Sequence, residues 1–192
     1  TNADIVRFVP TSLGTTTAGA FSWYFDGSDV GLAATAEDID AIDRLADGRI
    51  LISTSGSASV TGASGNDEDI FAFTPAAGGI GDNSSAGTWA VYFDGSDVGL
   101  ADSANEDIGG VWVDSSNNDI YLATLGAFSV TGASGDGADV FICHPTSIGA
   151  TMACTYGPGL FWDGSTKSFA GEIIDVVGLS AASFGGSLVH DI

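Results

Sequence analysis

The nine residues YFDGSDVGL occur twice, letter for letter, at positions 24–32 and 92–100 of the 192-residue chain. Aligning the chain with itself extends this match into a repeat of about 70 residues. Units of this kind fold as copies of one supersecondary structure that stack, because a single copy cannot bury its apolar face alone. This repeat constrains the fold more than any other feature of the sequence.

Each unit contains four short apolar runs, named a, b, c and d in chain order. In the first unit they are WYFDGSDVGL (23–32), IDAIDRLA (39–46), RILISTSG (49–56) and IFAFTP (70–75). In the second unit they are VYFDGSDVGL (91–100), IGGVWVD (108–114), DIYLATLG (119–126) and VFICHP (140–145). Runs b and c are joined by ADGR or SSNND, and such turns favour positive φ and connect antiparallel strands. Each unit is therefore predicted to be a four-stranded antiparallel meander.

The composition agrees with an all-β chain, because 28 glycines and many Ser and Thr residues separate the apolar runs. No segment sustains a helical apolar period, and TAEDIDAIDRLA is assigned to a strand because its counterpart contains Val-Trp-Val. We predict a single all-β repeat domain, three tandem four-stranded antiparallel meanders over residues 1–192. Its parts are a donated d strand with its connection (1–19), repeat one (20–79), repeat two (80–149) and a truncated repeat three (150–192).

The segment GGVWVDSSNNDIYLAT resembles the IAVDSxGNxYVTG hairpin of secreted bacterial β-propeller repeats of the SBBP type. DIFAFTP and DVFICHP resemble the DxFVxxxxP strand of that family, and VYFDGSD stands where the family has YLGGSGSD. The chain departs from the family in having FDG for LGG and only three copies of its repeat. It also resembles FDGSDVGL…EDIDA repeat arrays of large secreted bacterial proteins without an assigned activity. The resemblance implies β-propeller-like blades and export, and it implies no reaction.

The charge is strongly unbalanced, with 25 Asp and Glu against 4 Lys and Arg and a formal net charge of −21. Such a surface repels nucleic acid and anionic membranes, so neither is an expected partner. The sequence contains no run of 18 apolar residues, so no membrane span is predicted. Calcium sites, a saline habitat and a merely acidic surface all stay open as explanations. The start at Thr1 without a signal peptide fits a processed polypeptide, and we expect a secreted, extracellular or cell-surface location.

Acidic residues recur at fixed positions of the unit, in Gly-rich loops. Calcium takes six to eight oxygen ligands, which such loops can supply. Hairpin turns and solvated strand ends explain the same acids, so both interpretations stay open. A further acid precedes each d run, at Asp4, Asp69 and Asp139. The candidate calcium ligands are Asp26, Asp29, Glu37, Asp38, Asp94, Asp97, Glu106, Asp107, Asp163 and Glu172.

Cys143 and Cys154 are separated by a connection that contains Pro and Gly. Antiparallel neighbours joined by such a loop bring two Cβ atoms within bonding range, so we expect a disulfide, with two buried free thiols as the alternative. Asn83 begins the sequon Asn-Ser-Ser and is a candidate glycosylation site.

Support for catalysis is thin. His144 and His190 lie at unrelated points of the repeat, and the chain contains no HExxH, Gly-x-Ser-x-Gly or Walker motif. The prediction is a structural or self-assembling surface protein without enzyme activity. The alternative is an extracellular module that binds carbohydrate or protein, although the aromatic residues of run a are expected in the core. A hydrolase with an acidic pair is a third interpretation.

The copies are out of phase with the ends of the chain. ADIVRFVPTSLG at the start matches run d and its following turn, and SLVHDI at the end matches run c. Unpaired strand edges are a liability, so we predict that these two segments pair, within one chain as a ring or between chains. Exchange between chains, giving a ring or a filament, is favoured because propellers have four to eight blades. The assembly residues are Asp4, Ile5, Val6, Arg7, Phe8, Val9 and Pro10 with Ser187, Leu188, Val189, His190, Asp191 and Ile192.

Overall fold

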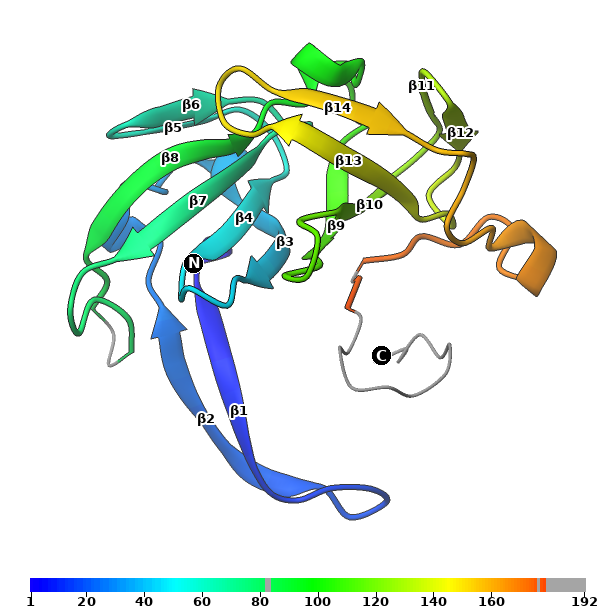
Figure 1. Cartoon of the computed structure of the whole chain (residues 1–192). Helices are drawn as coiled ribbons and strands as arrows, with labels where there is room; N and C mark the ends of the chain where they lie inside the picture. Colours follow the sequence, from blue (N-terminus) through cyan, green and yellow to red (C-terminus); the bar gives the residue numbers. More distant parts are fainter. Residues whose placement is uncertain (82–83, 176, 179–192) are drawn as a thin grey trace.

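The computed structural model describes residues 1–81, 84–175 and 177–178 (Figure 1). Its regular elements in those residues are β-strands and three-residue 3-10 turns, and the strands of every sheet pair antiparallel. The prediction of an antiparallel all-β protein is therefore confirmed. No helix in the described part of the chain has the length and apolar character needed to cross a membrane.

The first four-stranded sheet has the strand order β3-β4-β7-β8. Runs b and c form its β3–β4 hairpin, as predicted, through a turn in which Gly48 has a φ of 94°. All of β4 and the first four residues of β7 are buried, as expected for the central strands of a packed sheet. The strands are β3 (Ile39–Arg44), β4 (Ile50–Thr54), β7 (Ile70–Pro75) and β8 (Gly87–Phe93).

The second four-stranded sheet has the equivalent order β9-β10-β13-β14. The predicted disulfide is present in it, because Cys143 on β13 and Cys154 on β14 are joined by an S–S bond of 2.06 Å. Their Cα atoms lie 5.6 Å apart, so the bond ties run d of the second unit to the strand that follows it. The strands are β9 (Ile108–Val113), β10 (Ile120–Thr124), β13 (Phe141–Ser147) and β14 (Ala153–Tyr156).

A small extra hairpin lies between runs c and d of each unit, and the sequence analysis did not predict it. Both copies have the sequence SVTGASG, in which Gly62 and Gly132 have φ values of 103° and 105°. These left-handed positions favour glycine and allow the tight reversal. The strands are β5 (Ala58–Val60) with β6 (Ala63–Gly65), and β11 (Phe128–Val130) with β12 (Ala133–Gly135).

The sheets begin one run later than predicted. Run a does not pair with run b of its own unit. It pairs with run d of the preceding unit, so that β8 lies beside β7 and β14 beside β13. The connection from a to b holds 3-10 turns, which lead the chain away to the next sheet. They are η1 (Ser28–Val30) and η2 (Thr35–Glu37) in unit one and η3 (Ser96–Val98) in unit two.

The N-terminal strand also has a partner that the sequence analysis did not give it. β1 (Ile5–Ser12), a run d, pairs with β2 (Ala18–Phe25), the run a that follows it. The described residues therefore form two four-stranded sheets, one long two-stranded hairpin and two small hairpins, not three four-stranded meanders. Figure 1 shows this hairpin extending away from both sheets.

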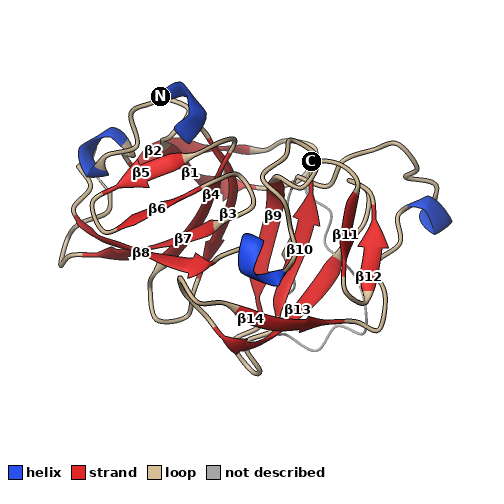
Figure 2. Ribbon diagram, turned by 90° about the horizontal axis from the view of Figure 1, so that it is seen from above, coloured by secondary structure: helices blue, strands red, loops and turns tan. Residues whose placement is uncertain are grey.

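The apolar core is divided among the junctions between successive units. At the first junction, the ring of Phe25 on β2 packs on Phe73 and Trp89 of the first sheet. At the second, the two four-stranded sheets, side by side in Figure 2, share a cluster that includes Leu51 and Ile108. A third cluster lies on the far side of the second sheet. Each unit thus buries a face against its neighbour, as in other repeat arrays.

One backbone hydrogen bond recurs at all three junctions. The first N–H of each run b donates to a carbonyl oxygen in the loop before the preceding run d. The pairs are Ile39 with Asn2 (3.1 Å), Ile108 with Asp67 (3.1 Å) and Ile174 with Gly137 (2.7 Å). The third unit therefore begins on the second sheet in the same way as the second unit begins on the first.

Candidate functional site

The Asp-Gly-Ser motif is FDGSD in units one and two and WDGST (162–166) in unit three, and its glycine lies against the loop that precedes the previous run d. Its N–H donates to the Asp carboxylate of that loop in every unit. The pairs are Gly27 with Asp4 (3.1 Å), Gly95 with Asp69 (2.8 Å) and Gly164 with Asp139 (3.0 Å). The acids noted before each run d are therefore clamps between strand ends, which the spacing alone did not reveal.

The two aspartates of FDGSD, predicted as calcium ligands, accept local hydrogen bonds. The first, at Asp26, Asp94 and Asp163, accepts from the Ser hydroxyl two residues later at 2.6–2.8 Å. The second holds the start of the strand that follows run d of the same unit: Asp29 accepts from Ser85 N, just before β8, and Asp97 accepts from Met152 N, just before β14, both at 2.9 Å. These contacts account for the repeated aspartates without an ion, and calcium binding by them stays a prediction.

The predicted ligand Glu37 closes the loop between η1 and β3. Its Oε2 accepts from Ala33 N and Ala34 N, both at 2.7 Å, and its Oε1 accepts from Ser59 N at 3.1 Å. Burial acts to raise the pKa of Glu37, but these three backbone donors outweigh burial and lower the pKa below 4.5. Glu106 repeats two of these bonds, whereas Glu172 is exposed.

Asp38 and Asp107 occupy the same place in their units but have different partners. Asp38 Oδ2 accepts from the Asn2 amide at 2.9 Å. Asp107 is buried instead beside Asp40 of β3, with the charge of Asp67 nearby. Burial, reinforced by the Asp107 carboxylate, raises the pKa of Asp40 to about 8, and burial raises the pKa of Asp107 to about 6.

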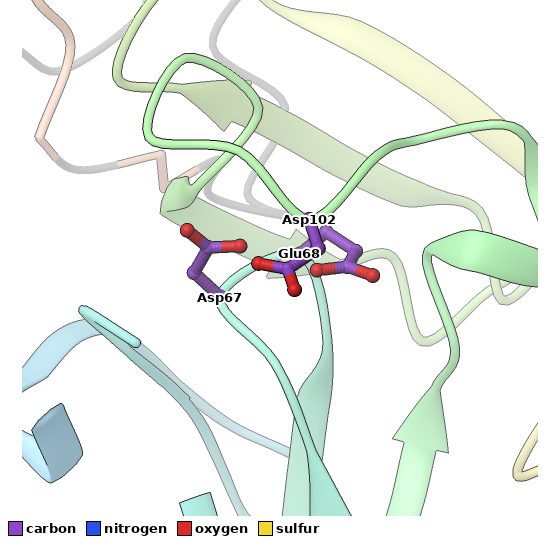
Figure 3. Close-up of side chains that lie close together, drawn as sticks. All are labelled: Asp67, Glu68 and Asp102. Carbon is purple, nitrogen blue, oxygen red and sulfur yellow. The ribbon is translucent and has the colours of Figure 1, made fainter. Parts of the chain in front are cut away.

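A second group of acids adjoins this pair at the same junction. Carboxylate oxygens of Asp67, Glu68 and Asp102 all lie within 4.8 Å of one another, and Figure 3 shows the three side chains converging. Asp67 and Glu68 belong to the loop before β7 and are buried, whereas Asp102 belongs to the loop before β9 and is exposed. Burial, with the neighbouring carboxylates, raises the pKa of Glu68 to about 7. None of these three was predicted, although NDED (66–69) in place of DGAD (136–139) was an available signal for Asp67 and Glu68.

The β1–β2 hairpin carries five of the nine exposed large hydrophobic side chains among the described residues. The side chains of Phe21, Val6 and Val9 are 74 %, 55 % and 45 % exposed. In both four-stranded sheets the strand from run d has a partner on each side, run c and run a. β1 pairs with β2 alone among the described strands, which leaves the edge that run c would occupy. The predicted partner segment, residues 187–192, and the glycosylation candidate Asn83 lie outside the described residues.

A groove of about 420 Å³ runs between the b–c turns of the two sheets. Arg49 lies in it with its guanidinium carbon 5.7 Å from the centre of the Tyr92 ring. Trp112, Asn118 and Ile148 also line the groove. This mixture of aromatic, cationic and amide groups could contact a polar ligand.

The chain's likeness to known proteins does not add to this geometry. The resemblance to SBBP-type repeats stays a prediction. The chain matches no protein-family model, no curated protein sequence and no solved structure.

Proposed function

We propose that the protein is an extracellular structural protein that assembles with further copies of itself, and that the β1–β2 hairpin is its assembly site. The observation that carries this proposal is an apolar surface of the hairpin whose equivalent in the first sheet is buried. A protein that works as a subunit needs such an exposed apolar surface, whereas on an isolated domain the same surface would promote aggregation.

The register of the strands establishes the equivalence. Phe8 pairs with Phe21 across the hairpin, as Phe73 pairs with Trp89 across β7 and β8. Trp89 is 7 % exposed because β2 of the preceding unit packs on it, whereas Phe21 is 74 % exposed. Burying a side chain of this size contributes about 2–3 kcal/mol, so a preceding unit supplied by another chain would bind favourably at this surface.

The free edge of β1 favours the same kind of partner. Its backbone groups match those of β7, which pairs with run c of its own sheet from Ile50↔Phe73 to Ile52↔Phe71. The occupant we propose is the b–c segment of a neighbouring copy, residues 172–192, because its sequence aligns with runs b and c. Addition of strands to an open edge supplies main-chain hydrogen bonds without any new fold. Successive copies would then form β-propeller-like blades in a ring or in a filament.

Other features agree with an extracellular structural role. The Cys143–Cys154 disulfide suits an oxidising compartment. The repeated acids are hydrogen-bonded to the loops they stabilise, which supports a role in the scaffold and not in catalysis. The net charge of −21 would keep copies soluble until specific edges meet.

The test is assembly of wild-type protein against Phe21→Lys, with Ile148→Lys as the control at another exposed apolar site. Sedimentation velocity over a concentration series and negative-stain microscopy should reveal oligomers or filaments of the wild type. Phe21→Lys should raise the midpoint concentration at least about tenfold, which corresponds to 1.4 kcal/mol of association free energy. A peptide of residues 172–192 should inhibit assembly. A monomeric wild type, or equal effects of both substitutions, would refute the proposal.

The alternative function, binding of carbohydrate or protein, would use the groove beside Arg49 and Tyr92. Aromatic side chains next to charged and amide groups suit a carbohydrate or a polar peptide. Binding of the monomeric Phe21→Lys variant to a glycan array, abolished by Trp112→Ala, would favour a binding module over a structural subunit.

A further inference from the structure

The acids at the second junction differ from the residues at the other two junctions. Asn2 at the first junction donates its amide to Asp38 at 2.9 Å, whereas Asp67 and Asp107 occupy these two places at the second. A favourable amide–carboxylate pair is thus replaced by two carboxylates. Gly137 takes the place of Asp67 at the third junction, so among the described residues these charges gather at the second junction.

The fold does not require a carboxylate at Glu68. The equivalent residues are Ala3 and Ala138, and both are buried. All three side chains have the same neighbour, because the Cβ of Ala3, Glu68 or Ala138 lies where a side chain on the FDGSD glycine would be. Alanine satisfies this packing in two units out of three, so the carboxylate of Glu68 needs another explanation.

Two oxygens of the group are buried and lack hydrogen-bond partners among the described residues. They are Glu68 Oε2 and Asp67 Oδ1, on side chains that are 1 % and 7 % exposed. An unpaired buried carboxylate costs several kcal/mol, and a like-charged neighbour adds to that cost. A bound cation would remove both costs.

We propose that this junction is a calcium site in which Asp67, Glu68 and Asp102 supply carboxylate ligands. Their oxygens lie within 4.8 Å of one another, close enough to share one ion (Figure 3). Calcium suits the group because it takes oxygen ligands in flexible geometry, including carboxylates and water. The exposed Asp102 would admit the ion and its remaining waters. The site is independent of the assembly surface, since the three ligands lie in one chain.

The ion would stabilise the contact between the two sheets. Asp67 and Glu68 precede β7 of the first sheet, and Asp102 lies on the path to β9 of the second. The Asp67 carbonyl also accepts the N–H of Ile108, the first residue of β9. Calcium would therefore bind at the contact between the first sheet and the start of β9, the strand with which the second sheet begins.

The test is calcium titration of the full chain by calorimetry, with thermal unfolding, in about 0.15 M NaCl to screen diffuse binding to the acidic surface. Wild-type protein should bind one calcium ion per chain, and calcium should raise its Tm. Glu68→Ala should weaken binding at least about tenfold, and so should Asp102→Asn, a substitution in an exposed loop. In EDTA, Glu68→Ala should be at least as stable as the wild type, because alanine is the residue of the other units.

Asp163→Asn is the control, because it removes an acid at a different junction. It should bind calcium as the wild type does. The proposal is wrong if the wild type neither binds calcium nor gains thermal stability, or if Glu68→Ala retains full affinity. Equal losses in Glu68→Ala and Asp163→Asn would mean diffuse counterion binding and would also overturn it.

Discussion

Asp69 Oδ1 accepts a hydrogen bond of 2.8 Å from the backbone N–H of Gly95, while its Oδ2 accepts one of 2.8 Å from Asn66 N. Asp69 lies just before β7 and Gly95 just after β8. Because the two strands are antiparallel, one carboxylate therefore joins the start of β7 to the end of β8. Asp4 and Asp139 hold the same position in the other units. The glycine belongs to the repeated nonapeptide, so this contact is one reason why the nonapeptide recurs.

Removal of the carboxylate should destabilise the protein. Asp69→Ala leaves the N–H groups of Gly95 and Asn66 without their acceptor in a buried place, and we expect a loss of about 2 kcal/mol or more of unfolding free energy. Urea unfolding followed by tryptophan fluorescence measures it. Asp47→Ala is the control, because it breaks an exposed ion pair with Arg49 and should cost less than about 1 kcal/mol. Equal losses would contradict a clamp at Asp69.

Glu37 should make the stability depend on pH. Its folded-state pKa is lowered from 4.5 by three backbone donors, so its stabilisation is complete above pH 4.5 and is lost as the pH falls through the folded-state value. Glu37→Gln should therefore be less stable than wild type at pH 6–7, and the difference should shrink as the pH falls below 4.5. Unfolding free energies across this range test the prediction. Glu172→Gln, at the equivalent exposed position, should change the unfolding free energy little at either pH, and a constant Glu37→Gln deficit would contradict it.

Local patterns predicted the strands better than the sheets. The Asp47-Gly48 turn correctly indicated the b–c hairpin, and the loop length between Cys143 and Cys154 correctly indicated the disulfide. The start of each sheet was not predictable from the repeat, because a periodic sequence has no marked origin. The connection from run a to run b contains 3-10 turns, η1 and η2 in unit one and η3 in unit two, which are too short to give a periodic signal.

The site residues divide in the same way. Repeated acids such as Asp29 and Glu37 were visible as a pattern, but their backbone partners lie in other segments of the chain. Glu68 could not be predicted as a site residue from the repeat, because the equivalent residues of the other units are alanines. Its environment emerges only when Gly95 and the next sheet fold against it.

The disulfide should contribute to stability through the chain it closes. Replacing both Cys143 and Cys154 by serine should lower the unfolding free energy by about 2–3 kcal/mol, as the chain-entropy model gives for a loop of this length. The midpoint of urea unfolding should fall, with the slope little changed. Labelling of the unfolded, unreduced wild type should find no reactive thiols, whereas two per chain would contradict the bond.

Gly95 should be coupled energetically to Asp69. Its φ of −65° is open to any residue, yet a Cβ there would meet the Glu68 carbonyl oxygen at 2.3 Å, so only glycine allows this close approach. Gly95→Ala should push the FDGSD loop away and cost about 1–3 kcal/mol. The double variant with Asp69→Ala should lose less than the sum of the single losses, because both break one contact. Unfolding free energies of the wild type, the two single variants and the double variant complete the cycle. Additive losses would show that Gly95 and Asp69 are not energetically coupled and would contradict the prediction.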